Sequence, residues 1–313
     1  MSQASVHCLR LMYIGRAFLM IQVTETSFGE WPQCLKVTGR DIEMIVPLDF
    51  GPRVMSLRLA DGPNLFQILP EESGPLKIRG GHRLWVAPER KEVTWVDDPE
   101  PVEVEQLEDY RLIVRGQRED RTGLIKEMAL EIDGGVITVT HQIYNTNPWT
   151  IELAPWALTI MNPGGWAIAP FPPRGVHPID LAPSNPLVLW PYTDLSDPRW
   201  KFMQKRFTLR QDPDAATPQK IGSFAEETWC AYVLGDHVFK KRTQAYPHMD
   251  YPDFGCSFEL FSNATTLELE TLGPIVALEP GECVRHEEEW KLEKRSVEEL
   301  GTAASPGPYF DPK

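Results

Sequence analysis

The stretch Leu267-Glu268-Leu269-Glu270 alternates strictly between apolar and charged side chains. Successive side chains of a β-strand point to opposite faces of a sheet, so this stretch predicts a strand with its leucines on one face. Both glutamates then share the other face, either as a solvated surface or as part of a site. The stretch Val136-Ile137-Thr138-Val139-Thr140 has the same two-residue period and predicts a second strand.

Alternating or β-branched runs recur along the chain, between turn signals such as Asp133-Gly134-Gly135 and Pro280-Gly281-Glu282. Helical periodicity is nearly absent, and the 29 prolines agree with this because proline is excluded from helix interiors. Strands are predicted at residues 35–38, 42–46, 54–59, 65–69, 102–107, 111–114, 124–132, 136–144, 150–161, 187–190, 202–209, 228–234, 238–241, 256–261, 266–272 and 284–292. So many strands in one chain predict an all-β fold of two stacked antiparallel sheets, a large sandwich.

The 313 residues are organised, in our prediction, as one large domain over residues 20–295. Residues 1–19 contain an apolar run that Arg10 and Arg16 interrupt, too short for a membrane span and without the features of a secretory signal. We expect them to be a flexible leader or a start-site artefact. A capping box from Ser296 to Glu299 predicts a short helix, and the remainder of residues 296–313 is predicted as a flexible tail.

The net charge of −14 argues against nucleic acid, whose binding proteins carry a basic surface, and does not favour an anionic membrane. A small, neutral or modestly polar ligand is therefore expected, although Arg79 and Arg83 could hold a carboxylate or phosphate locally. The sequence gives no sign of a large assembly, and we expect a monomer or weak homodimer.

The five cysteines are widely spaced and form no CxxC motif, which predicts neither a zinc knuckle nor a redox dithiol. Reduced thiols of a cytoplasmic protein are the expected state. His237, His248 and His286 lack partners at metal-ligand spacing. We therefore expect no required metal and no cofactor.

Residues 76–95, LKIRGGHRLWVAPERKEVTW, gather ionisable groups around Gly80-Gly81 and the tryptophans Trp85 and Trp95. We predict a loop here, because a core strand would bury too many charges. Indole faces beside hydrogen-bonding groups suit a sugar, which offers an apolar C–H face and several hydroxyls. The alternative is a structural loop held by Arg–Glu pairs, which for Arg83, Glu89 and Arg90 is the favoured interpretation.

Four phrases together resemble the galactose mutarotase-like superfamily, in one of its branches of unknown function. They are RGGHRLW at 79–85, ELAPWALT at 152–159, YTDLSDPRW at 192–200 and the run 267–290. The resemblance covers residues 21–295 and implies a β-supersandwich that binds carbohydrate in a groove on one face. Members include aldose 1-epimerases, non-catalytic domains and hexose-6-phosphate mutarotases. The Arg-Gly-Gly phrase resembles the last group, which implies a sugar phosphate as an alternative ligand.

Aldose 1-epimerases carry a glutamate base in a Leu-Glu-Thr phrase before a Pro-Gly-Glu turn, and Leu269-Glu270-Thr271 before Pro280-Gly281-Glu282 resembles this order. By resemblance Glu270 is the general base of mutarotation, which needs a base, an acid and no cofactor. The histidine acid of the family is missing, because residues 152–161 contain Trp156 and no histidine. We take His82 as a provisional acid, with Lys220 or an acidic residue as the alternatives.

Three interpretations follow from these residues. The first is an epimerase-like isomerase, the second a carbohydrate-binding protein that kept the groove and lost the acid, and the third a lyase or hydrolase that uses Glu259 and Glu270. The predicted groove residues are Arg79, His82, Arg83, Trp85, Trp156, Tyr192, Asp194, Glu259 and Glu270. For Trp156 core packing is the alternative to sugar stacking. Tyr192 and Asp194 are equally compatible with the groove and with a loop outside it, and Asp197 is predicted as a turn residue.

Overall fold

The computed structural model describes residues 21–70, 77–107, 111–133 and 135–296, together with two short strands near the C-terminus. These are β23 (Gly301–Thr302) and β24 (Ser305–Pro306), which pair with each other within the predicted tail. The predicted leader, 1–19, lies outside the described residues, as does most of the predicted helix at 296–300, so both stay predictions.

The prediction of an all-β fold is confirmed, because the described chain folds into antiparallel sheets with one short helical turn, α1 (Pro252–Gly255). A ten-stranded sheet has the order β14 (Trp200–Phe202), β15 (Arg206–Arg210), β12 (Trp166–Pro170), β17 (Glu227–Leu234), β18 (His237–Gln244), β22 (Cys283–Lys294), β10 (Val136–Asn145), β9 (Leu124–Asp133), β8 (Arg111–Arg115) and β7 (Glu103–Leu107). An eight-stranded sheet contains β13 (Leu187–Leu189), β16 (Gln219–Ser223), β19 (Phe258–Ser262), β20 (Leu267–Leu272), β11 (Ile151–Ile160), β6 (His82–Ala87) and β4 (Arg53–Val54), and β21 (Val276–Leu278) pairs with β11.

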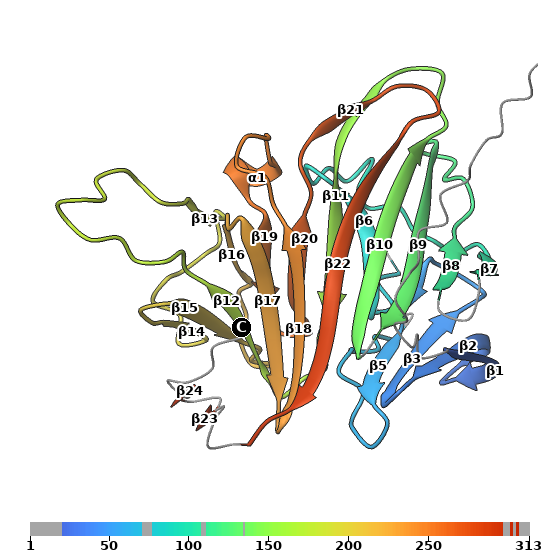
Figure 1. Ribbon diagram of the computed structural model, residues 1–313, viewed down its shortest axis with the longest axis horizontal. Coiled ribbons are helices and arrows are strands. Elements are labelled where there is room, and N and C mark those ends of the chain that lie inside the picture. Colours follow the sequence, from blue (N-terminus) through green and yellow to red (C-terminus); the bar gives the residue numbers. More distant parts are fainter. Residues whose placement is uncertain are drawn as a thin grey trace, which may run out of the picture.

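A smaller sheet of four strands lies at the N-terminal side, in the order β1 (Gln22–Phe28), β2 (Trp31–Gly39), β3 (Ile42–Pro47) and β5 (Ser56–Leu59). Figure 1 shows the two large sheets stacked on each other, with β22 and β10 in front of β11 and β6. Among the described residues, no helix combines the length and the apolar character that crossing a membrane would require.

The main core lies between the two large sheets. Leu267 and Leu269 of β20 are buried in the same cluster as Ile137 and Val139 of β10, as the alternation of both stretches predicts. Glu270 points to the opposite face of β20, but that face is not solvated, because the side chain is only 1 % exposed. The alternative of a solvated surface for the glutamates of β20 is therefore wrong.

The predicted loop at residues 76–95 contains a central strand instead. β6 pairs with β11 on one side and with β4 on the other, and each of its residues is buried. Because both of its faces are covered, the hydrophobic alternation that identifies a half-exposed strand is missing from its sequence. The strands β1, β12, β16 and β21 were not predicted either, and residues 65–69 form only isolated bridges rather than a strand.

Gly80 and Gly81 set the start of β6. Both have positive φ angles, 89° and 69°. A Cβ atom at Gly80 would lie 2.0 Å from the carbonyl oxygen of Gln67, and one at Gly81 would lie 2.5 Å from that of Val54. The glycine pair therefore permits both a turn and a close approach of two backbone segments at this point.

The long connection between β12 and β14 carries β13 and extends away from the sheets before it returns (Figure 1). Its return brings Trp190 and Tyr192 to β16. The Thr193 hydroxyl donates to the carbonyl oxygen of Lys220, and the Asp194 amide donates to the Gln219 side chain at 2.9 Å. These two bonds fix the end of the connection against the eight-stranded sheet.

Candidate functional site

One row of residues crosses the centre of the eight-stranded sheet. Leu158 on β11 lies opposite Arg83 on β6 and opposite Glu270 on β20, and Glu270 in turn lies opposite Glu259 on β19. Residues opposite each other in adjacent strands project from the same face. We call this face, which points away from the ten-stranded sheet, the site face; it also carries Trp85, Trp156 and Lys220.

Lys220 joins the two glutamates of this row. Its Nζ lies 2.6 Å from Glu259 and 2.9 Å from Glu270, and all three side chains are buried. The Trp156 indole also donates to Glu270, at 2.9 Å, and the Lys220 ammonium lies over the rings of Trp156 and Trp190. The carboxylate of Glu270 is therefore held by two donors.

The surroundings of this row shift the pKa values of Glu259 and Lys220. Burial and the neighbouring Glu270 hold the pKa of Glu259 well above its usual range, although Lys220 acts in the opposite direction. Burial opposes the charge of Lys220, but Glu259 and Glu270 outweigh it and raise the pKa of the ammonium. The raised pKa favours a proton on Glu259, whose carboxyl group shares the Lys220 ammonium with Glu270.

Arg83 and two tryptophans form the next part of the site face. The guanidinium of Arg83 lies 4.0 Å from the ring of Trp85, and Trp85 meets Trp156 edge to face with centroids 5.7 Å apart. Glu268 is 3.9 Å from Arg83, and burial raises the pKa of this carboxyl to about 7. A cavity of about 390 Å³, bounded by residues 51–53, 96–100 and 116–121, reaches Arg83 and Trp85.

Tyr192 covers the Lys220 end of the site face. Its side chain is 38 % exposed, and burial raises its pKa while Lys220 lowers it, which reflects their proximity. Asp194 lies nearby but turns its carboxylate to Ser196, where the amide and hydroxyl donate at 2.8 and 2.6 Å. These hydrogen bonds lower the pKa of Asp194 and give it the geometry of a turn residue.

Arg79 has different neighbours from those expected. It forms ion pairs with Asp97 at 2.7 Å and Asp98 at 3.0 Å, and its guanidinium lies over the ring of Phe50. The aspartates at 97 and 98 therefore tie Arg79 to the loop beside β6, while Arg83 takes the position in the row with Glu270.

His82 lies on the face of the sheet opposite to Glu270, so the expected groove between these two residues does not form. Neighbouring residues of a strand point to opposite faces, and Arg83 occupies the site face. His82 is fully buried between the two large sheets, where Nε2 lies 2.8 Å from Nε2 of His141 and Nδ1 lies 2.9 Å from the Thr159 hydroxyl. The backbone of β6 separates it from Glu270.

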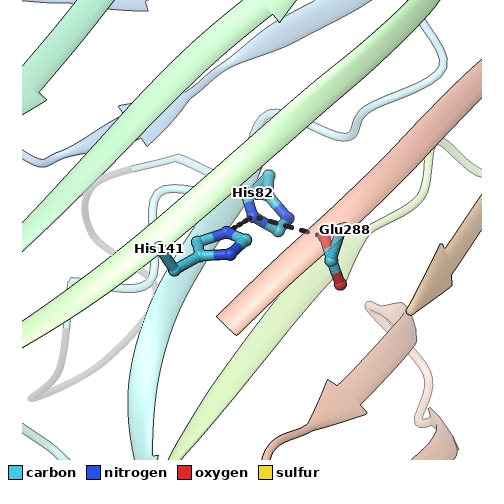
Figure 2. A group of neighbouring side chains, drawn as sticks. All are labelled: His82, His141 and Glu288. Carbon is cyan, nitrogen blue, oxygen red and sulfur yellow. Dashed lines mark hydrogen bonds and ion pairs between the residues drawn. The ribbon is translucent and has the colours of Figure 1, made fainter. Parts of the chain in front are cut away.

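Figure 2 shows His82 with His141 and Glu288, which come from three different strands and meet between the sheets. We call these residues, with Lys241 and His286, the interior cluster. Its ligand-type atoms at His82, His141 and Glu288 lie within 4.8 Å of one another, a separation that a metal ion could bridge.

The hydrogen bonds of the interior cluster leave little need for a metal ion. Nδ1 of His141 faces the His286 carbonyl oxygen at 3.1 Å and so carries the proton, which leaves Nε2 of His141 to accept from His82. Lys241 lies 2.9 Å from Glu288 and also donates to Ala157 O and Thr159. The ammonium thus balances the carboxylate, and a divalent cation beside it would be repelled. The expectation of no required metal stays a prediction.

No family model matches the sequence, and no curated protein matches it. Solved structures do resemble the fold. A galactose mutarotase-like protein from Lactobacillus casei has a TM-score of 0.55 and 10% identity, over 83% of this chain and 100% of that one. A Klebsiella pneumoniae protein provisionally assigned as an aldose 1-epimerase gives 0.57 and 12%, over 87% of this chain and 83% of that one.

The chain has the galactose mutarotase-like fold. A third structure, a galactose mutarotase-like protein from Clostridium acetobutylicum, agrees with a TM-score of 0.51 and 9% identity, over 90% of this chain and 100% of that one. At these identities the comparisons establish the fold alone. The resemblance of the sequence phrases to this superfamily is thereby confirmed at the level of the fold.

Within this galactose mutarotase-like fold, sequence reasoning underestimated Lys220. The sequence suggests it only as an alternative acid. Its position between two glutamates could not be predicted, because residues 219–223 were not predicted as a strand. The interior cluster was missed for a related reason. Its members come from β6, β10, β18 and β22, and their spacing in the sequence follows no metal-ligand pattern.

Proposed function

We propose that this protein binds a sugar on the site face and speeds the exchange of its anomers, with Glu270 as the general base. The observation that carries the proposal is the pairing of Glu270 with Lys220 and Glu259 in one buried row. Similarity to galactose mutarotase-like structures supports a sugar as the ligand. The tryptophans Trp85 and Trp156 are 8 % and 3 % exposed, so their rings become available for its C–H face once the cover over the site has moved.

The chemistry needs one proton removed and one delivered. Glu270 takes the proton from the anomeric hydroxyl while an acid protonates the ring oxygen, after which the ring opens, the C1–C2 bond rotates and the ring closes again. Both oxygens are bonded to the same carbon, so the acid and the base are needed side by side. We propose Glu259 as the acid instead of His82, because its pKa is raised and it shares Lys220 with Glu270.

The cover over the site has to move for a sugar to enter. Glu270 is 1 % exposed, and the Lys220 ammonium lies 4.6 Å from the ring of Trp156 and 4.7 Å from that of Trp190. A sugar hydroxyl then replaces part of the contact between Lys220 and Glu270. The partly exposed Tyr192 is the natural first contact for the incoming ring.

Polarimetry and exchange NMR test this function on a panel of hexoses, pentoses, uronic acids and hexose phosphates. The wild-type protein should speed anomer exchange of at least one of them. If it binds none of the panel and accelerates none, the proposal is wrong.

The buried state of Glu270 favours a second candidate, a carbohydrate-binding protein without catalysis. A carboxylate already held by Lys220 and Trp156 is less available as a base than a free one. This candidate predicts saturable sugar binding with no change in the rate of anomer exchange. Trp85→Ala should then weaken binding, because an aromatic contact of about 0.5–1.5 kcal/mol is lost.

The lyase or hydrolase alternative has less support. Glycosidases place their two carboxyl groups on either side of the bond that is cleaved. Glu259 and Glu270 lie instead on adjacent strands and contact the same ammonium. They suit two neighbouring oxygens better than the two sides of a glycosidic bond.

We further propose a cytoplasmic location and a monomer or weak homodimer, with no nucleic acid or membrane as partner. The described cysteines are free thiols, and Cys34, Cys230 and Cys256 are buried, which suits a reducing compartment. The net charge of −14 supports the absence of a nucleic acid partner.

A further inference from the structure

Arg83 and Glu270 are the two ends of a short span on the site face. Each lies opposite Leu158, so they are two strands apart. Neighbouring strands are about 4.8 Å apart, which places the two backbone positions about 10 Å from each other. Leu158 is itself 2 % exposed, so the cover over the site face has to move before a sugar ring can lie above it. Such a ring would meet Glu270 at one end and Arg83 at the other.

Arg83 is buried without a full set of partners. It is 3 % exposed, and its Nε and Nη1 have no hydrogen-bond partner among the described residues. Its Nη2 lies 3.9 Å from Glu268, which is longer than a hydrogen bond. A buried guanidinium is normally paired, because removing the charge from water is costly.

Arg53 shows what a satisfied arginine looks like in the same surroundings. It lies directly opposite Arg83 in the next strand and is equally buried. Its Nε and Nη2 donate to Asp98 at 2.6 and 3.0 Å, and Nη1 donates to the carbonyl oxygens of Ile78 and Gly80. The contrast shows that the fold can saturate a buried arginine here, and that it leaves Arg83 unsaturated.

The charge of Arg83 is only partly balanced. Burial lowers its pKa to about 10, so the guanidinium remains charged at neutral pH. Burial raises the pKa of Glu268 to about 7, which weakens the negative charge available to balance Arg83. The site face thus keeps a fraction of a positive charge within a chain whose net charge is −14. A ligand with one negative charge would complete the balance.

We propose that Arg83 binds the carboxylate of a sugar acid whose ring lies over Leu158 and whose anomeric carbon faces Glu270. The inference rests on the proposed function and names its substrate class, a uronic acid. The cavity of about 390 Å³ that reaches Arg83 and Trp85 provides space for the carboxylate end. A planar carboxylate matches the planar guanidinium, while a phosphate dianion would bring more negative charge than Arg83 can balance beside Glu268.

The test compares sugars that differ only in their acidic group. Calorimetry measures the affinity of the wild-type protein for D-galacturonate and D-galactose, for D-glucuronate and D-glucose, and for galactose 6-phosphate. We expect one uronate to bind at least tenfold more tightly than its neutral counterpart. Arg83→Gln should bring this ratio close to one, because the cation is lost, and Arg83→Lys should give an intermediate ratio. Arg285→Gln, at an exposed ion pair, is the matched control and should leave the ratio unchanged.

Several results would overturn the inference. They are equal or weaker binding of both uronates, tighter binding of galactose 6-phosphate than of galacturonate, and a uronate preference that survives in Arg83→Gln. The ratio of uronate to neutral-sugar affinity in the wild-type protein requires no variant. It therefore tests the inference by itself if neither Arg83→Gln nor Arg83→Lys folds. Anomer exchange of neutral sugars without a uronate preference would overturn this inference and leave the proposed function intact. A protein that binds no sugar would overturn both.

Discussion

The ammonium nitrogen of Lys220 lies 2.9 Å from the carboxylate of Glu270, and both side chains are almost fully buried. The same nitrogen contacts Glu259, so one cation serves two carboxyl groups. Removing one partner of a buried ion pair destabilises a protein much more than replacing both partners by apolar residues of similar size. This asymmetry makes the pair accessible to stability measurements that need no ligand.

Lys220→Met should destabilise the protein by about 3–5 kcal/mol, because it leaves two carboxyl groups together in a dry site. Adding Glu259→Gln should recover part of this loss, since one of the two acidic groups is then neutral. Denaturant unfolding measures both changes in free energy. Arg242→Met removes an exposed partner of Glu289 and is the control, with an expected change of at most about 1 kcal/mol. Equal losses of stability in Lys220→Met and Arg242→Met would contradict the account of a buried ion pair.

Glu270→Gln should abolish anomer exchange while it keeps most of the sugar affinity. The amide preserves the shape of the side chain but cannot take the proton, and an acid–base group contributes on the order of 10²–10⁴ in rate. Exchange NMR measures the rate with the best sugar of the panel, and calorimetry measures its binding. Glu287→Gln, on the exposed face of β22, is the control. A rate within tenfold of the wild type would exclude Glu270 as the base.

The interior cluster should bind no metal tightly. Lys241 already balances Glu288, and the proton on His82 Nε2 occupies the position of a metal-ligand lone pair. We expect the purified protein to contain less than stoichiometric zinc, and its melting temperature to be the same with a chelator as with added Zn²⁺. One tightly bound equivalent that raises the melting temperature would show that His82 and His141 are ligands after all.

The sequence was most informative where one face of a strand is apolar and the other polar. The strands at 136–145 and 267–272 followed directly from alternation, and the second one placed Glu270 on the site face. β6 was mistaken for a loop because it is buried on both faces, so its polar residues form two networks, with His82 on one side and Arg83 on the other. Which face each residue takes depends on the register with β11, and the local sequence does not contain that information.

The stability of the protein should depend on pH through His286. Burial is the main reason that its pKa falls to about 3, against 6.5 in the unfolded chain, although Glu288 acts in the opposite direction and His141 and Lys241 reinforce the shift. Above pH 6.5 the histidine is neutral in both states. As the pH falls from 6.5 toward 3, His286 binds a proton in the unfolded chain but not in the folded protein, so stability is lost.

The variant His286→Gln isolates this contribution. Glutamine can still donate to the Thr271 hydroxyl that His286 contacts at 2.9 Å, but it does not titrate. The free energy of unfolding of the wild type should therefore fall relative to the variant by up to about 1.4 kcal/mol for each pH unit below 6.5. Buried groups such as Glu268, whose raised pKa acts in the opposite direction, are present in both proteins and cancel in the difference. Urea unfolding at intervals between pH 8 and pH 5 measures this difference. A constant difference across this range would mean that His286 accepts its proton in the folded state, and that the interior cluster is more open to water than its burial indicates.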